Sequence, residues 1–194
     1  VKILQKSGCI VKYGVLKKKT DFANRRFLTF YQKKRPYIIL KWAKTADDFI
    51  APIDKEKKSR KAFWISNAYS RKIVHKWRSQ EAAILVGVQT VINDNPKLTN
   101  RHYKGNNPLR LVFDPNNRTP AKSFIIEDKE PTIFFNKEKQ MDLINGKKYI
   151  IIKPYNIRSF FLFCCANDIQ SVIIEGGKTT LEKFIDSGCW DEAR

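Results

Sequence analysis

A buried strand followed at once by a dense set of polar side chains is the feature that most constrains this 194-residue chain. Residues 83–88 form a continuous apolar run that includes Gly87, which is typical of a strand covered on both faces of a parallel sheet. Polar side chains and one proline follow: Thr90, Asn93, Asp94, Asn95, Pro96, Thr99 and Arg101. Because α/β folds place ligands at the C-terminal ends of buried strands, this stretch predicts a polar binding loop.

Strand and helix patterns alternate along the rest of the chain. The helix patterns cover residues 20–33, 66–78, 156–167 and 179–187. The strand patterns cover residues 37–40, 83–88, 109–114, 132–135, 149–152 and 171–174. Residues 1–19 resemble a short strand pair or the last strand of a preceding unit. This alternation predicts an α/β fold with a mainly parallel central sheet flanked by helices.

The composition points to a globular protein with a strong positive charge. The formal charge is +19, from 38 basic and 19 acidic residues, but the lysines are spread along the whole chain. Charge alone is a weak argument for nucleic acid, and we expect no such partner. The four cysteines lack a Cys-x-x-Cys spacing, so we expect free thiols, no metal site and a cytoplasmic protein. No apolar run reaches membrane-spanning length, so we expect no membrane contact.

Three of the predicted strands end in polar clusters, at residues 43–48, 90–101 and 175–180. In a parallel sheet these ends lie at one edge, so the clusters converge. Gly176 and Gly177 precede a helix, and backbone N–H groups at such a helix start favour a phosphate. The pattern leaves Glu175 either a hydrogen-bond acceptor for a ligand or a solvated strand end. It leaves Lys41 either a lysine that reaches to solvent or one that faces a ligand.

Several classes of enzyme require sequence motifs that this chain lacks. The chain has no phosphate-binding G-x-x-x-x-G-K-[ST] motif, no G-x-G-x-x-G after a strand and no G-x-S-x-G. It has two histidines, and His75 lies off the apolar stripe of its helix, which favours a surface or hydrogen-bonded residue over a catalyst. An anion-binding pocket for a phosphorylated substrate and a phosphate-bearing cofactor remains.

The central stretch ILVGVQTVINDNPKLTNR resembles the signature of one family, the reductase domain of the bacterial bifunctional riboflavin-biosynthesis deaminase/reductase. The likeness continues in order through PYIILKWA, WIS, WRSQ, PLRLVFD and IIEGGKTTLEKFIDSGCWDE. It implies a dihydrofolate-reductase-like fold, with residues 36–194 as a reductase domain cut short at its C-terminal end. Residues 1–35 would be the tail of a preceding deaminase-like domain and its connecting helix. The chain lacks the zinc motif of the deaminase, so we do not expect it to deaminate.

The resemblance also implies a reaction and a set of site residues. NADPH would reduce the ribosyl group of 5-amino-6-(5-phosphoribosylamino)uracil to ribityl, in a homodimer. The residues expected at NADPH are Ala43, Trp64, Thr90, Asp94, Gly177, Lys178, Thr179, Thr180, Leu181, Glu182 and Lys183. The residues expected at the phosphorylated pyrimidine are Arg78, Leu98, Arg101 and Glu175. Those expected to take part in catalysis are Lys41, Glu175 and Asp94, with Lys41 a candidate proton donor or orienting group.

Two positions depart from the family pattern. Asp47-Asp48 stands where the family has Asp-Gly, so we expect this turn to be built differently, without the positive φ that glycine tolerates. Ala62 stands where the family has a serine expected to touch the substrate. Two alternatives therefore remain open: a basic binding module of the same fold without catalysis, or a reductase of the same fold with a pterin-like or different phosphoribosyl substrate.

Overall fold

The computed structural model describes residues 1–50 and 65–194, and within them the chain forms one eight-stranded sheet. The strand order is β5-β6-β4-β3-β2-β7-β1-β8. The strands are β1 (Tyr37–Leu40), β2 (Ala83–Gly87), β3 (Leu109–Phe113), β4 (Thr132–Asn136), β5 (Met141–Ile144), β6 (Lys147–Ile151), β7 (Ser171–Ile174) and β8 (Glu192–Ala193). All neighbours are parallel except β5 and β6. The predicted α/β fold with a mainly parallel sheet is confirmed.

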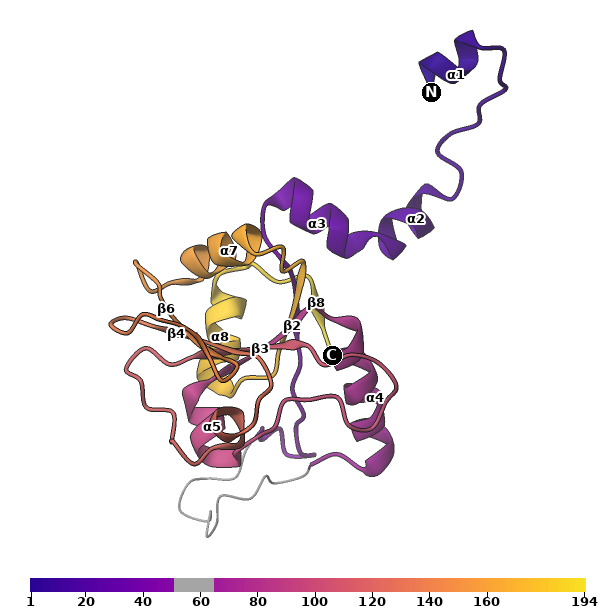
Figure 1. Cartoon of the computed structure of the whole chain (residues 1–194). Coiled ribbons are helices and arrows are strands. Elements are labelled where there is room, and N and C mark those ends of the chain that lie inside the picture. The colour runs from indigo at the N-terminus through magenta and orange to yellow at the C-terminus, as the bar shows by residue number, and fades with distance from the viewer. Residues whose placement is uncertain (51–64) are drawn as a thin grey trace.

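Helices cover both faces of the sheet (Figure 1). They are α4 (Ala68–Gln80), α5 (Val88–Asp94), α6 (Phe124–Glu127), α7 (Ile157–Ala166) and α8 (Lys178–Asp186). Leu85 of β2 packs in one apolar cluster with Phe160 of α7 and Phe184 of α8. Its neighbour Ile84 packs in a second cluster with Val91 of α5. Successive strand residues point to opposite faces, which explains why β2 reads as an uninterrupted apolar run.

The N-terminal region differs from the prediction. It forms three helices, α1 (Lys2–Lys6), α2 (Lys17–Ala23) and α3 (Arg25–Lys33), and α1 projects away from the sheet (Figure 1). The predicted strand pair in residues 1–19 is wrong, because Gly8 and Gly14 take left-handed φ angles of 81° and 76° between short helices. The predicted single helix over 20–33 is divided at Asn24.

The central stretch also differs from the prediction, because its polar part begins as a helix. Residues 88–94 form α5, with Gly87 as the N-cap, and the loop begins only at Asn95. The short elements α6, β5 and β8 carry no periodic pattern long enough to predict them. The cap of α4 is Asn67, whose side chain accepts from the Ser70 N–H, so this helix begins at Ala68 and not at residue 66 as predicted.

A buried ionic cluster connects β3 with the loops before β4. The Arg110 side chain is 1% exposed and makes two hydrogen bonds, of 2.8 and 2.6 Å, to the Asp128 carboxylate. It also donates to Thr132 Oγ1 and to the Lys97 carbonyl, while the Lys147 ammonium lies 3.2 Å from Asp128. Burial opposes the charged form of Asp128, but the two cations outweigh it and lower the pKa of this carboxyl group.

Removing Asp128 is therefore expected to destabilise the fold strongly. The Asp128→Ala variant leaves the Arg110 guanidinium buried without its carboxylate, which costs about 3 kcal/mol of unfolding free energy. Urea denaturation measures this loss. Asp21→Ala, which removes an exposed helical ion pair with Lys17, is the control, and we expect a change of at most about 0.5 kcal/mol. Equal effects of the two variants would contradict a structural role for the cluster.

Candidate functional site

The C-terminal ends of β1, β2 and β7 open into one cavity of about 450 Å³. The clusters 90–101 and 175–180 thus meet at one edge of the sheet, as its parallel arrangement predicts, whereas the cluster 43–48 contributes only Ala43. The expected ligand residues that line this cavity are Lys41, Ala43, Arg78, Thr90, Asp94, Leu98, Glu175, Gly177, Lys178, Thr179 and Thr180. Trp64, also expected there, and Ala62 lie outside the described residues.

A group of three charged side chains stands on one side of this cavity. Arg78 of α4 donates through Nε and NH2 to the two oxygens of Glu175, at 2.8 and 2.7 Å. The Lys41 ammonium, just after β1, lies 3.8 Å from Glu175 Oε2. The Glu175 side chain is 8% exposed, so the reading of Glu175 as a solvated strand end is wrong. Burial works against the carboxylate, but Arg78 and then Lys41 outweigh it and lower the pKa of Glu175.

Two helix N-termini face each other across another part of the cavity. Helices α5 and α8 start after Gly87 and Gly177, and neither has a side-chain cap, so their first N–H groups are available to an anion. Thr90 Oγ1 of α5 accepts the Gly177 N–H at 3.0 Å and ties the two helix starts together. A Cβ at Gly87 or at Gly176 would lie 2.5 or 2.6 Å from Thr180, so this approach requires glycine.

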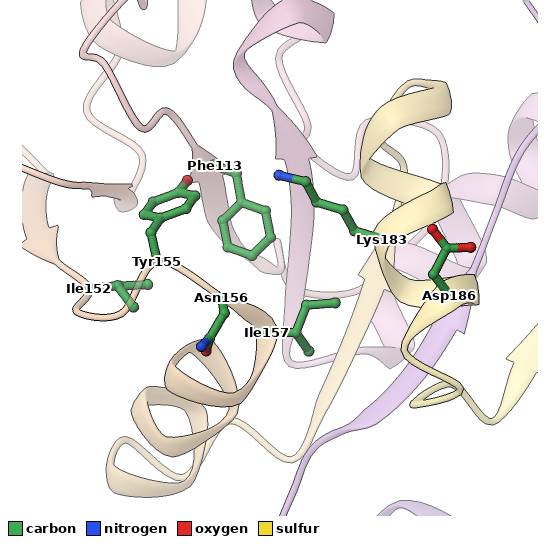
Figure 2. A pocket seen from close by; sticks show the side chains of 7 residues that line it. All are labelled: Phe113, Ile152, Tyr155, Asn156, Ile157, Lys183 and Asp186. Carbon is green, nitrogen blue, oxygen red and sulfur yellow. The ribbon is translucent and has the colours of Figure 1, made fainter.

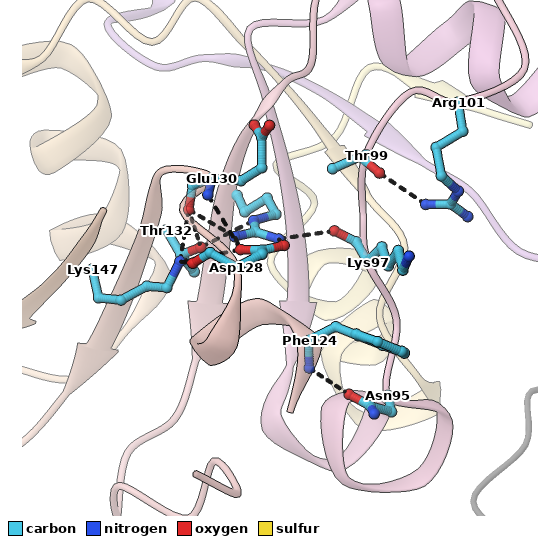
Figure 3. Close-up of polar contacts among 10 residues, drawn as sticks. Asn95, Lys97, Thr99, Arg101, Phe124, Asp128, Glu130, Thr132 and Lys147 are labelled. Atoms are coloured by element: carbon cyan, nitrogen blue, oxygen red, sulfur yellow. Dashed lines mark hydrogen bonds and ion pairs between the residues drawn. The ribbon is translucent and has the colours of Figure 1, made fainter. Parts of the chain in front are cut away.

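Residues 95–101 form a segment held in a strained conformation beside the cavity. Leu98 is 3% exposed and adopts a left-handed φ of 56°, which costs a residue other than glycine free energy. Figure 3 shows two bonds that hold the segment, one at its first residue and one in its middle. Asn95 Oδ1 accepts the Phe124 N–H at 2.8 Å, and the Lys97 carbonyl accepts from Arg110 at 3.0 Å. These bonds fix the position of Leu98 against the cavity.

Helix α4 holds the end of the same segment. Arg78 NH1 donates to the Thr99 carbonyl at 3.1 Å, and the Arg101 N–H donates to His75 Nδ1 at 2.8 Å. The Arg101 guanidinium donates to Thr99 Oγ1, also at 2.8 Å (Figure 3). Arg101 does not line the cavity itself; it is an exposed residue at the end of the segment that forms its wall.

His75 is buried, although it lies off the apolar stripe that the sequence indicates along α4. It is 4% exposed, whereas the aromatic side chain of Tyr69 on the same helix is 73% exposed. Burial first, and then the charges of Arg78 and Arg101, lower the pKa of His75 to about 4. His75 is therefore neutral at pH 7, as an acceptor at Nδ1 requires.

The turn at residues 45–49 corrects the expectation that Asp47-Asp48 avoids a positive φ. Asp48 adopts a φ of 66°, so the turn keeps the left-handed conformation although an aspartate replaces glycine. The backbone closes the turn, with the Asp48 N–H donating to the Thr45 carbonyl and Thr45 Oγ1 accepting from Phe49 N–H. The Asp48 carboxylate also pairs with Lys44. Aspartate tolerates this conformation better than most residues.

The later residues of α8 lie away from this cavity. Leu181 is 6% exposed in the core, and exposed Glu182 pairs with Lys178 at 3.6 Å. Lys183 lines a second cavity of about 380 Å³ between β3, α7 and α8 (Figure 2). Aromatic rings of Phe113 and Tyr155 stand on its wall. The predicted cofactor-binding run 177–183 is thus divided. Residues 177–180 line the first cavity, Leu181 lies in the core, Glu182 is exposed and Lys183 lines the second cavity.

Two other lining residues, Trp42 and Gln89, were not predicted from the sequence, and Asn93 was predicted only as part of the polar cluster 90–101. Trp42 directly follows Lys41, and Gln89 and Asn93 stand one turn apart on α5, where their side chains form a 2.9 Å hydrogen bond. Recognising residues 88–94 as a helix would have placed Gln89 and Asn93 on one face. Among the described residues, no three His, Cys, Asp or Glu side chains gather as a possible metal site. No helix in the same part of the chain is long and apolar enough to span a membrane.

The comparison with protein families decides where this fold and cavity belong. A family model described as the RibD C-terminal domain matches residues 36–194. This chain belongs to the RibD C-terminal domain family. The resemblance drawn from the motifs is confirmed, and so is the predicted fold class.

Relatives and solved structures of the family agree with this assignment. The riboflavin biosynthesis protein RibD of Aquifex aeolicus is 34% identical over 197 residues, which cover 98% of this chain and 54% of that protein. The 2,5-diamino-6-ribosylamino-4(3H)-pyrimidinone 5′-phosphate reductase of Methanothermobacter thermautotrophicus is 29% identical, with 82% and 76% covered. A crystal structure of the Thermotoga maritima deaminase/5-amino-6-(5-phosphoribosylamino)uracil reductase has a TM-score of 0.83 and 30% identity, with 96% and 52% covered.

The fraction of each relative that this chain covers differs among these proteins. This chain spans about half the length of the RibD relatives, and about three quarters of the archaeal reductase. The match to the Aquifex aeolicus RibD covers 98% of this chain and so extends to residues before 36, whereas the family model starts at residue 36, just before β1.

The lowered pKa of His75 predicts a loss of stability in mild acid. Between pH 6.5 and 4 the unfolded chain protonates this side chain and the folded chain does not, so the unfolding free energy falls as the pH drops. From pH 7 to pH 5 the expected fall is about 2 kcal/mol. His75→Asn removes the titrating group, so this variant should lose much less over the same interval in urea denaturation.

An exposed, non-titrating side chain of the same helix provides the control. Gln80 is exposed at the end of α4, and Gln80→Asn should keep the pH dependence of the unmodified chain. If His75→Asn and the unmodified chain lose the same free energy between pH 7 and pH 5, His75 is not a buried neutral side chain.

Proposed function

We propose that this chain uses NADPH to reduce the ribosyl group of 5-amino-6-(5-phosphoribosylamino)uracil to a ribityl group. The observation that carries the proposal is the shape of one cavity, with an anion cradle of two helix starts on one part of its wall and the Arg78–Glu175–Lys41 group on another. Family membership and the reductase named among the relatives support the same reaction.

The cofactor part of the proposal rests on the two helix starts. The N–H groups at the start of α8 suit a phosphate of the cofactor, and the glycines at 87 and 176 leave room for the Thr180 side chain at this helix start. Ala43, Thr90 and Asp94 would border the cofactor in the same cavity. In the second cavity Lys183 offers a cation and the rings of Phe113 and Tyr155 offer flat apolar surfaces, which suits the adenosine end of a dinucleotide. When bound, NADPH supplies the hydride.

The charges around the cavity favour a phosphorylated substrate. Lys41, Arg78 and Lys178 line it with Glu175 and Asp94, and Arg101 adds a further cation at its wall. The guanidinium of Arg101 suits the substrate phosphate, because it makes forked, charge-assisted hydrogen bonds.

The chemical step then needs positioning and a proton. Lys41 holds its ammonium group at the edge of the cavity, 3.8 Å from the Glu175 carboxylate, and we assign it as the proton donor. Arg78 orients Glu175 through two hydrogen bonds, so that the carboxylate can accept from the pyrimidine. Leu98, fixed in its strained conformation, closes the wall and excludes water.

The arrangement of the whole protein is also a proposal. Residues 1–35 would be the tail of a preceding deaminase-like domain with its connecting helix. The length of the RibD relatives supports this, and so do the exposed side chains of Phe22, Phe27 and Tyr31 on α2 and α3. A homodimer in the cytoplasm completes the proposal, and light scattering of the purified chain measures the number of subunits.

Cofactor binding gives the first test of this proposal. Titration with NADPH, followed by fluorescence, should show saturable binding, and Thr90→Val should weaken it about five-fold, because the Gly177 N–H loses its acceptor. Thr20→Val, an exposed threonine on α2, should bind as the unmodified chain does. No saturable binding at millimolar NADPH would contradict the proposal.

Substrate binding gives the second test. Arg101→Ala should raise the KM for the phosphorylated pyrimidine at least ten-fold and leave kcat within about two-fold, because a charge-assisted contact is lost that is equal in ground and transition states. Lys104→Ala, an exposed cation nearby, is the control with unchanged KM.

The outcomes of these tests separate the alternatives. Full activity of Arg101→Ala without a rise in KM would refute the phosphate role and favour a reductase with a different substrate. Absence of NADPH binding together with steeply salt-dependent retention of RNA would favour a basic binding module instead.

A further inference from the structure

The hydrogen bond between His75 and the backbone of Arg101 has no part in the reaction as described so far. His75 is 4% exposed and lies on α4, one turn before Arg78. Its Nδ1 accepts the Arg101 N–H at 2.8 Å, so this nitrogen carries no proton. A buried polar side chain that makes a specific bond to a ligand-binding residue is in a position to set the geometry of that residue.

One turn of α4 holds both residues on which the orientation of Arg101 depends. His75 fixes the backbone of Arg101, and Arg78 fixes the backbone of Thr99 through its carbonyl. The Arg101 guanidinium in turn donates to Thr99 Oγ1 at 2.8 Å. Thr99 and Arg101, which are joined by a side-chain hydrogen bond, are therefore both anchored to α4.

The surroundings of His75 keep its ring in place. The ring of His102 packs edge-on against it, with centroids 4.6 Å apart. His102 directly follows Arg101, so the residue after the one that His75 holds also covers its ring. The neighbouring cations Arg78 and Arg101 disfavour a protonated ring and preserve the acceptor.

We propose that His75 is a positioning residue, which fixes the backbone of Arg101 so that its guanidinium meets the phosphate group of the substrate. The inference rests on the proposed function, in which Arg101 binds that phosphate. Arg101 is exposed, and a long exposed side chain loses binding free energy when it must be ordered on each encounter. A backbone anchored by His75 reduces that cost.

Three substitutions of His75 separate positioning from packing. Asparagine places its Oδ1 where histidine has Nδ1 and keeps the acceptor, whereas glutamine places its amide one methylene farther out, and leucine removes the acceptor. We expect His75→Leu and His75→Gln to raise the KM for the phosphorylated pyrimidine about ten-fold, with kcat within about two-fold. His75→Asn should stay within about three-fold of the unmodified chain. The KM for NADPH should stay unchanged in all three.

The phosphate group provides the decisive comparison. With the same pyrimidine lacking its phosphate, the unmodified chain and His75→Gln should have equal KM values. In an Arg101→Ala background His75→Gln should cause no further rise, because the residue through which it acts is gone. Circular dichroism identifies a variant that does not fold; if His75→Leu is such a variant, the pair His75→Asn and His75→Gln carries the test.

The results that overturn the inference are distinct from those that overturn the proposed function. Equal KM values for His75→Asn and His75→Gln, or equal losses with and without the substrate phosphate, refute the positioning role alone. An unmodified chain that neither turns over nor binds the phosphorylated pyrimidine in calorimetry refutes the proposed function, and this inference with it.

Discussion

The paired hydrogen bonds between Arg78 and Glu175 join three parts of the molecule that are far apart in the sequence. They connect α4 with the end of β7, and a third bond from the same guanidinium reaches the Thr99 carbonyl. Two charges this deeply buried repay their loss of hydration only when their geometry is close to ideal. The position of α4, and with it the wall of the cavity formed by residues 95–101, therefore depends on this pair.

The cavity owes its charge to a few specific side chains, whereas the net charge of the chain comes from many scattered residues. The basic residues behind the +19 are spread along the sequence, whereas the cavity combines specific cations with the carboxylates of Glu175 and Asp94. His75, beside two guanidiniums, stays neutral and acts as an acceptor. Local geometry, rather than net charge, thus decides which anion this edge of the sheet can recognise.

The buried strands and the convergence of the polar clusters were predictable from the sequence, because both follow from local patterns. Strands 37–40 and 171–174 have their predicted bounds, since residues buried on both faces form unbroken apolar runs. Helix α5 was not predictable, because its cavity-facing residues make it resemble a loop. The two residues of β8 form a strand only by pairing with β1. Gly177 and Lys183 line different cavities because they lie on different sides and turns of α8. This difference cannot be read from a run of adjacent residues.

The bond from the Gly177 N–H to Thr90 Oγ1 has a consequence for the entropy of ligand binding. It joins the starts of α5 and α8 within the protein itself, so an anion entering between them does not have to draw two independent helices together. The conformational cost of forming the cradle is thus borne during folding, and the available N–H groups keep a fixed spacing before any ligand arrives. Ligands whose charged groups do not fit that spacing cannot induce a closer one without breaking this bond, so selectivity for the shape of the anion is built into the folded chain.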